Sequence, residues 1–168
     1  MKKIGIISDT HSFLDQQVFQ YFKDVDEIWH AGDIGNLELT NEIEKHKKLR
    51  AVFGNIDSHE VRAVFPKHEI IQIEGCVILM IHIAGAFGKY NDETKKLILE
   101  HKPNILVCGH SHIVKIAFDQ KYNLLYINSG AAGKHGFHKM RTILRFELND
   151  GKPQNMELIE LGSRAAIS

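Results

Sequence analysis

The chain has no excess of either charge, few cysteines and no long apolar run. Lysine and arginine together number 21, and aspartate and glutamate also number 21. This balance gives no positive surface of the kind that binds duplex nucleic acid or an anionic membrane. The apolar run at residues 4–7 is too short for a signal peptide, and no run approaches membrane-spanning length. We therefore expect neither a long nucleic-acid partner nor a membrane.

The two cysteines, Cys76 and Cys108, are far apart and lack Cys-x-x-Cys spacing. Each lies inside an apolar, strand-like run, which is typical of a small reduced core residue. This usage predicts a cytoplasmic protein. A liganding role for Cys108, beside His110, is the alternative, and packing is the favoured reading.

The length and composition predict one domain, residues 1–168, with one continuous core, since 43% of 168 residues are hydrophobic. Short apolar runs in the first part alternate with helical periodicity. We predict strands at residues 4–7, 28–31, 51–53, 77–81 and 105–108, and helices at residues 14–22, 37–46 and 94–101. This alternation indicates an α/β fold.

The second part of the chain has a different pattern, because its apolar runs are separated only by short turns. Predicted strands lie at residues 113–120, 124–128, 142–148 and 156–161, and a further hairpin turns at residues 74–75. Two sheets packed face to face, with helices outside, account for this mixture.

Aspartate, asparagine and histidine side chains follow the predicted strands of the first part. Each motif alone reads as a turn with a polar tip, and Asp9 alone reads as a helix cap. As a series they indicate one site, because α/β sheets bind ligands beyond the carboxyl ends of their strands. The preceding glycines allow close approach to a ligand. The candidate ligands are Asp9, His11, Asp33, Asn55, His82, His110 and His112.

The ordered motifs Asp-x-His, Gly-Asp, Gly-Asn-x-Asp, His and Gly-His-x-His resemble the calcineurin-like metallophosphoesterases, in particular their small bacterial and archaeal phosphodiesterase branch. The resemblance spans residues 4–130. It implies a four-layer α/β/β/α sandwich of two mixed β-sheets flanked by helices, which some schemes class as α+β. It also implies two metal sites sharing Asp33, one completed by Asp9, His11 and His112 and the other by Asn55, His82 and His110.

Mixed carboxylate and imidazole ligands suit divalent transition metals. We expect two such ions, manganese first, with iron, zinc, nickel and cobalt as the alternatives. Paired ions activate a bridging water and clamp a phosphoryl group, so the expected reaction is hydrolysis of a small phosphate ester by a metal-bridging hydroxide. The resemblance favours a diester over a monoester. It implies catalytic roles for Asn55, Asp57 and His110.

Two of the three departures from the family pattern concern the expected site, and the third is Asn128-Ser129-Gly130-Ala131 in place of Asn-Pro-Gly-Ser. Ile56 stands where many relatives have a catalytic histidine, which leaves the protonation of the leaving group unassigned. His82 keeps its place, but Ile83 follows it where the family has glycine, so the loop at residues 83–90 differs. Asp57 either orients a ligand or water, or caps the segment that begins at Ser58.

Several basic residues are candidate substrate contacts, and His30 is a candidate for supporting the ligands from behind. The loop at residues 133–141 combines glycines, cations and one aromatic ring, which suits a phosphate or a nucleobase, although a plain basic surface loop is the favoured alternative. The predicted substrate contacts are Asn55, His59, Arg62, His135 and His138.

Two other functions share this fold. A retromer subunit of the same fold is a non-catalytic interaction platform, and a phosphomonoesterase uses a similar metal centre. The complete ligand series favours the enzyme over the scaffold. Relatives are often dimers or tetramers, so a homodimer or homotetramer is expected.

Overall fold

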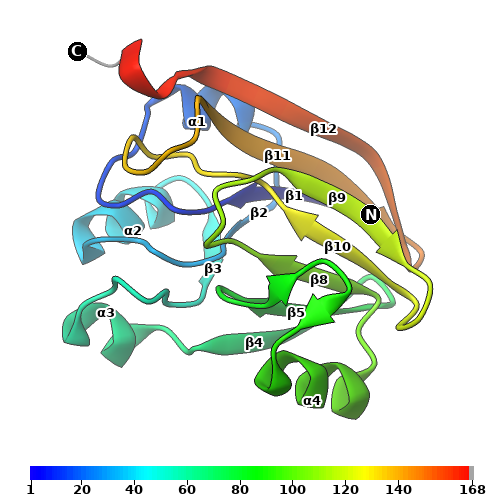
Figure 1. Ribbon diagram of the computed structural model, residues 1–168. Coiled ribbons are helices and arrows are strands. Elements are labelled where there is room, and N and C mark those ends of the chain that lie inside the picture. The colour runs from blue at the N-terminus through cyan, green and yellow to red at the C-terminus, as the bar shows by residue number, and fades with distance from the viewer. Residues whose placement is uncertain (167–168) are drawn as a thin grey trace.

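Two five-stranded β-sheets form the centre of the computed structural model, which describes residues 1–166 (Figure 1). Residues 167 and 168, at the end of the predicted domain, lie outside the described residues. The strands of the first sheet are β1 (Lys2–Ile7), β2 (Glu27–His30), β3 (Lys48–Ala51), β11 (Met140–Asn149) and β12 (Lys152–Ser163). The strands of the second sheet are β4 (His68–Ile73), β5 (Cys76–Ile81), β8 (Ile105–Cys108), β9 (Lys115–Asp119) and β10 (Leu124–Asn128).

Each sheet contains three adjacent parallel strands. The first sheet has the order β12-β11-β1-β2-β3, in which β1, β2 and β3 are parallel. The second has the order β4-β5-β8-β10-β9, in which β5, β8 and β10 are parallel. The other strands pair antiparallel. Both sheets are therefore mixed.

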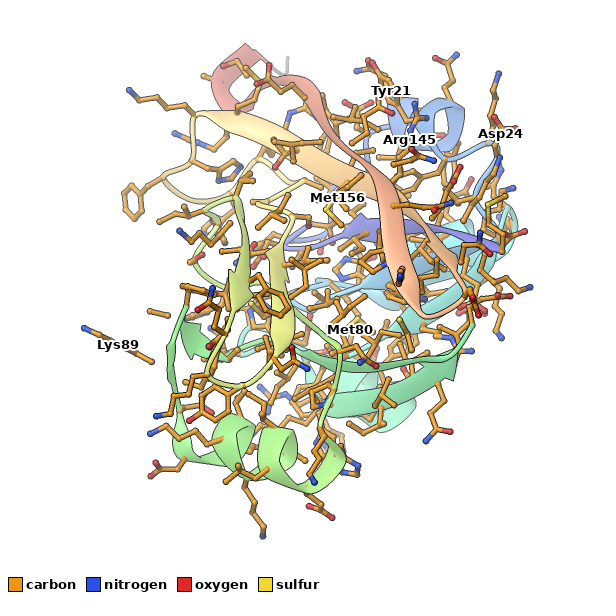
Figure 2. The ribbon with its side chains drawn as sticks, turned by 90° about the vertical axis from the view of Figure 1, so that its right-hand side faces the viewer. Tyr21, Asp24, Met80, Lys89, Arg145 and Met156 are labelled. Atoms are coloured by element: carbon orange, nitrogen blue, oxygen red, sulfur yellow. The ribbon has the colours of Figure 1, made fainter. Side chains whose placement is uncertain are left out.

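The core lies between the sheets and beneath the helices on either side. Ile4 and Ile6 of β1 point between the sheets, whereas Ile7 points to the outer face, as strand alternation requires. Met80 and Met156 contact the inner cluster from opposite sheets (Figure 2). The outer clusters contain the apolar faces of the helices. This arrangement confirms the predicted four-layer sandwich of two mixed sheets.

Within residues 1–166, four α-helices and a short hairpin complete the fold. The helices α1 (Gln17–Tyr21), α2 (Leu37–Glu44) and α3 (His59–Val64) cover the first sheet, and α4 (Asp92–His101) covers the second. The hairpin consists of β6 (Gly85–Ala86) and β7 (Lys89–Tyr90), and a 3-10 turn, η1 (Arg164–Ala166), follows β12. No helix in residues 1–166 is long and apolar enough to cross a membrane.

The structure differs from the sequence prediction at several boundaries. The strand expected at residues 51–53 runs from Lys48 to Ala51, and Phe53 instead donates its N–H to Pro66 O at 2.9 Å. Helix α3 was not predicted, because six residues give too little periodicity. Cys76 and Cys108 are buried free thiols, as predicted. Burial raises the pKa of Cys108 to about 12, which disfavours a thiolate ligand.

Candidate metal centre

The loops that follow the parallel strands bring all seven predicted ligands together at one side of the sandwich. Those in the first sheet contribute four side chains, after β1, β2 and β3. Those in the second contribute three, after β5 and β8. This is where α/β sheets place ligand sites. The side chains in this set are Asp9, His11, Asp33, Asn55, His82, His110 and His112.

Five of these seven residues have a left-handed backbone. Their φ angles are 53° at Asp9, 44° at His11, 57° at Asp33, 73° at His110 and 63° at His112. For a residue other than glycine, this region of φ/ψ space costs roughly 1–2 kcal/mol of conformational free energy. Such strain gathers at functional sites, where the surrounding structure imposes it. The strained backbone therefore indicates that the surrounding structure holds these loops in a conformation that positions the ligand side chains.

A first ligand group consists of Asp9, His11 and His112, whose candidate ligand atoms all lie within 4.8 Å of one another. His112 Nε2 lies 3.3 Å from Asp9 Oδ1. His11 Nε2 lies 3.5 Å from Asp33 Oδ2, which brings this carboxylate to the edge of the group. One carboxylate and two imidazoles, with a second carboxylate adjacent, suit a divalent transition metal.

A second ligand group consists of Asp33, His82 and His110, also within 4.8 Å of one another. His82 Nε2 lies 3.2 Å from Asp33 Oδ2, the oxygen that faces His11 in the first group. Asn55 Oδ1 lies 3.0 Å from His110 Nδ1 and joins this group. The same carboxylate oxygen of Asp33 thus stands between the two groups.

Three ligand atoms in these groups are buried without a hydrogen bond. Within residues 1–166, they are Asp9 Oδ1, His11 Nε2 and His82 Nε2. Buried polar atoms nearly always have a partner, so orphaned ones need an explanation. A cation between them would satisfy all three. The donor set therefore fits metal ions at both groups.

Hydrogen bonds behind the ligands determine which atom each one presents. His82 donates its Nδ1–H to Ala31 O at 2.7 Å, which leaves the Nε2 lone pair facing Asp33. Asp9 Oδ2 accepts from Ser8 Oγ at 2.7 Å and from the His110 N–H at 3.2 Å, so Oδ1 is left for a ligand. The alternative in which Asp9 caps a helix is wrong.

Burial and charge act in opposite directions on the ionisable ligands. Burial, together with the neighbouring His135 and His112, lowers the pKa of His11 more than the carboxylates of Asp33 and Asp9 raise it. Burial also acts to lower the pKa of His82, but the same two carboxylates outweigh it, so the pKa of His82 is raised. The pKa of Asp33 is lowered, because its interactions with His82 exceed the effect of burial. Asp33 therefore remains an anion at neutral pH.

Asp57 forms hydrogen bonds with backbone N–H groups and belongs to neither ligand group. Its carboxylate is buried and accepts from the N–H groups of Gly54, Gly35 and Ile34 at 2.7, 2.8 and 3.1 Å. These bonds tie the loop carrying Asn55 to the loop carrying Asp33. The helix-cap alternative is wrong, since Ser58 Oγ caps α3 by accepting from the Val61 N–H. The arrangement also speaks against a direct catalytic role.

His30 and Asn128 also support the ligand loops. His30 Nδ1 accepts from the Gly32 N–H at 3.1 Å, so its Nε2–H donates to Thr10 Oγ1 at 2.9 Å. This matches the supporting role considered for His30. Asn128 was missed by the sequence reasoning. It donates to Gly109 O at 3.0 Å behind His110, and its position at the end of a parallel strand was the available signal.

A cavity of about 450 Å³ opens above the two ligand groups and is lined by three predicted substrate contacts, Asn55, His135 and His138. The His135 ring lies 4.7 Å from the His11 ring, centroid to centroid. His138 donates Nε2–H to Gly133 O at 2.7 Å, and burial lowers its pKa. His59 is exposed at the start of α3 and is not among the residues of this cavity wall.

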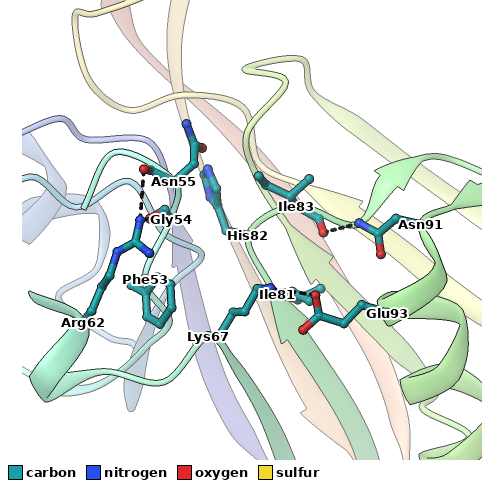
Figure 3. Close-up of a pocket in the computed structure, with 10 residues that line it drawn as sticks. All are labelled: Phe53, Gly54, Asn55, Arg62, Lys67, Ile81, His82, Ile83, Asn91 and Glu93. Atoms are coloured by element: carbon teal, nitrogen blue, oxygen red, sulfur yellow. Dashed lines mark hydrogen bonds and ion pairs between the residues drawn. The ribbon is translucent and has the colours of Figure 1, made fainter. Parts of the chain in front are cut away.

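A second cavity, of about 340 Å³, begins at Asn55 and His82 and runs between α3 and α4 (Figure 3). Arg62 lines it, but its guanidinium donates to Asp57 O at 2.8 Å and to Asn55 O at 3.1 Å. Lys67 Nζ forms an ion pair with Glu93 Oε2 at 2.8 Å. The predicted contact Arg62 therefore borders the site while bracing the Asn55 loop.

Residues 1–151 match the family model of the calcineurin-like phosphoesterase superfamily domain. The chain therefore belongs to the calcineurin-like phosphoesterase superfamily. It is 33% identical, over 135 residues, to a Methanocaldococcus jannaschii protein named "Probable metallophosphoesterase", with 76% of this chain and 67% of that protein covered. The chain spans about two thirds of the length of the curated archaeal relatives that it matches.

Solved structures of two kinds share the fold. A novel archaeal phosphodiesterase has a TM-score of 0.75 at 21% identity, with 95% of this chain and 99% of that chain covered. Vps29 from Entamoeba histolytica, complexed with zinc, has a TM-score of 0.70 at 17% identity, with 94% and 98% covered. At these identities the likeness shows the fold alone.

Proposed function

We propose that this chain is a dinuclear, metal-dependent phosphodiesterase. The observation that carries the proposal is the position of Asp33, whose Oδ2 lies 3.5 Å from His11 Nε2 and 3.2 Å from His82 Nε2. One carboxylate can therefore serve two ions. Asp9, His11 and His112 would complete one site, and Asn55, His82 and His110 the other. Manganese is the expected metal, with iron, zinc, nickel or cobalt as alternatives.

Two bound divalent ions would supply the Lewis-acid charge that activates water and neutralises phosphate oxygens. The chain's own residues position the substrate. Asn55 gives its amide oxygen to the second ligand group and keeps an N–H for a phosphate oxygen. His110 is exposed to the cavity, and His135 and His138 line it beside His11 and His112, where they would contact the ester.

The scaffold alternative is supported by the Vps29 structures, which have the same fold. The orphaned ligand atoms weigh against it, because a surface that only binds proteins gains nothing from buried, unpartnered Asp9 Oδ1 and His11 Nε2. A phosphomonoesterase would use the same ligands, so the choice of diester rests on the family branch. Cytoplasmic location and a homodimer or homotetramer stay predictions.

Metal stoichiometry tests the centre directly. Chelator-treated protein reconstituted with manganese should approach two ions per chain, and His82→Ala should lower the stoichiometry. His101→Ala, on α4, is the matched control and should leave it unchanged. A plateau at one ion in the unsubstituted protein would contradict the dinuclear proposal.

Activity separates the alternatives. The reconstituted protein should hydrolyse bis(4-nitrophenyl) phosphate faster than 4-nitrophenyl phosphate, and cyclic nucleotides extend the same screen. Preference for the monoester would favour the phosphomonoesterase. No hydrolysis of any ester by protein holding two ions would favour the scaffold.

A further inference from the structure

A third cavity, of about 520 Å³, lies on the other side of Ile83 from the cavity of Figure 3. We call it the hairpin cavity, because the β6–β7 hairpin forms one of its walls. Lys89 of this hairpin points away from the body of the molecule (Figure 2). The side chains that matter for its chemistry are Ile83, Phe87, His110, Ile113, Lys115 and Tyr126.

The hairpin cavity adjoins the space above the ligand groups. His110, Ser111 and Ile113 line both spaces. On the opposite side, Asn55 lines both the space above the ligands and the cavity of Figure 3. A phosphorus atom at the ligand groups would therefore have one side cavity on each flank. A phosphodiester has two ester groups to place, whereas a monoester has one.

The walls of the hairpin cavity are apolar. Ile113 is 68% exposed and Ile83 is 38% exposed, beside the rings of Phe87 and Tyr126. Its lining contains one fully charged side chain, Lys115, whose Nζ lies 5.4 Å from the Phe87 ring centroid. Exposed apolar side chains around a concave site are typical of ligand pockets. The cavity of Figure 3 differs, since the Lys67–Glu93 ion pair lies at its wall.

The segment after His82 forms this wall. Ile83 lines the cavity, and the chain then turns at Gly85, whose φ is 91°. A Cβ on Gly85 would meet Lys89 O at 2.7 Å, so the hairpin closes only with glycine there. Asn91 Nδ2 donates to Ile83 O at 2.8 Å and holds the segment in place (Figure 3). The pocket is thus a built feature of this chain.

We propose that the hairpin cavity binds an apolar, aromatic ester group of the phosphodiester substrate. The inference rests on the proposed phosphodiesterase function, because the phosphate at the ligand groups anchors the ester. The apolar walls exclude water from an aromatic ring, and burial of its surface provides the binding energy. A small alkyl ester would leave the walls uncovered.

Binding of two phosphate diesters tests the proposal. The zinc-loaded protein, which is diamagnetic, is titrated with diphenyl phosphate and with dimethyl phosphate by calorimetry. We expect diphenyl phosphate to bind at least about tenfold more tightly. Ile113→Ser should reduce this preference roughly fivefold. Leu99→Ser is the matched control, since Leu99 is 66% exposed on α4, away from the cavity.

Methyl NMR locates the ring. Isoleucine-labelled, zinc-loaded protein should show ring-current shifts at Ile113 when diphenyl phosphate is added. Equal affinity for the two diesters, a preference unchanged by Ile113→Ser, or no shift at Ile113 would overturn the inference. Hydrolysis of bis(4-nitrophenyl) phosphate in that case would leave the proposed function standing. Selective binding without hydrolysis would support the pocket and contradict the enzyme.

Discussion

The candidate metal centre has a buried floor and an exposed rim. Asp9, Asp33 and His82 form the floor, where their exposed fractions are 0%, 3% and 2%. Asn55, His110 and His135 belong to the rim and are exposed. The floor contains both carboxylates, so most of the negative charge of the centre is buried.

The two parts also differ in how they are held. Ser8 and Ala31 form hydrogen bonds with floor residues, namely Asp9 and His82. Asp57 accepts from the N–H groups of Ile34 and Gly35, directly after Asp33. At the rim, Asn55 and His110 contact each other, and Arg62 holds the Asn55 carbonyl. The floor is therefore preorganised for ions, while the rim is open to the ester. This division predicts which substitutions act on catalysis and which act on selectivity.

The largest effect is expected from Asp33→Asn, which removes one of the two carboxylates of the floor. The amide keeps the shape but removes the charge shared by both ligand groups. We expect a loss of at least about 10³-fold in the hydrolysis of bis(4-nitrophenyl) phosphate, because both sites lose their common carboxylate. Far-UV circular dichroism should stay unchanged. Activity within tenfold of the unsubstituted protein would refute the bridging role.

The next effect concerns the acid stability of the metal-free protein through His30, which is buried behind the floor. Burial lowers the pKa of His30 from 6.5 to about 4. The unfolded chain thus takes up the proton first as pH falls, so His30 contributes stability above pH 6.5 that is lost between pH 6.5 and pH 4. The loss is about 3 kcal/mol.

Urea unfolding at several pH values measures this contribution of His30 to the free energy of unfolding. His30→Gln has no titrating group there, so its free energy of unfolding should fall about 3 kcal/mol less than that of the unsubstituted protein between pH 7.5 and 4. His101→Gln is the matched control. The comparison of variants is needed because His82, whose pKa is raised, contributes with the opposite sign. Parallel curves for His30→Gln and the unsubstituted protein would contradict the assignment.

Asp57→Asn should weaken the hydrogen bonds that tie the Asn55 loop to the Asp33 loop. An amide nitrogen would face backbone N–H groups now bound by the carboxylate, which should cost roughly 2 kcal/mol of unfolding free energy and weaken metal binding. Asp119→Asn is the matched control, because Asp119 is also buried and accepts from Tyr90 and from the Lys121 and Tyr122 N–H groups, away from the centre. Calorimetry should show weaker metal binding for Asp57→Asn alone.

Sequence reasoning located the floor better than its supports. Asp9 and Asp33 come shortly after apolar strands, and the carboxyl ends of parallel strands meet at one edge of a sheet, so the local pattern was enough. Asp57 acts through backbone N–H groups of the distant Asp33 loop, and Arg62 acts through carbonyls of the loop just before it. No periodicity reports either contact. Helix α3 is too short to give a pattern, and the β3 boundary depends on the pairing of Phe53 with Pro66. Tertiary contacts decide these features.

Substitution of Arg62 should have the smallest effect. It tests whether Arg62 supports the Asn55 loop or contacts the substrate. Sequence reasoning made it a substrate contact, whereas its Nε and Nη2 donate to Asp57 O and Asn55 O, and its guanidinium lies 4.7 Å from the Phe53 ring centroid. Lysine keeps the charge but lacks the planar fork that reaches two carbonyls.

If Arg62 braces the Asn55 loop, Arg62→Lys and Arg62→Gln should lower kcat alike, by roughly threefold to tenfold, with KM little changed. If it binds the phosphate, Arg62→Lys should retain activity and Arg62→Gln should raise KM. Arg145→Lys is the matched control, since Arg145 also donates to a carbonyl, that of Tyr21, far from the centre. A KM that is raised in Arg62→Gln but not in Arg62→Lys would therefore identify Arg62 as a substrate contact rather than a support of the Asn55 loop.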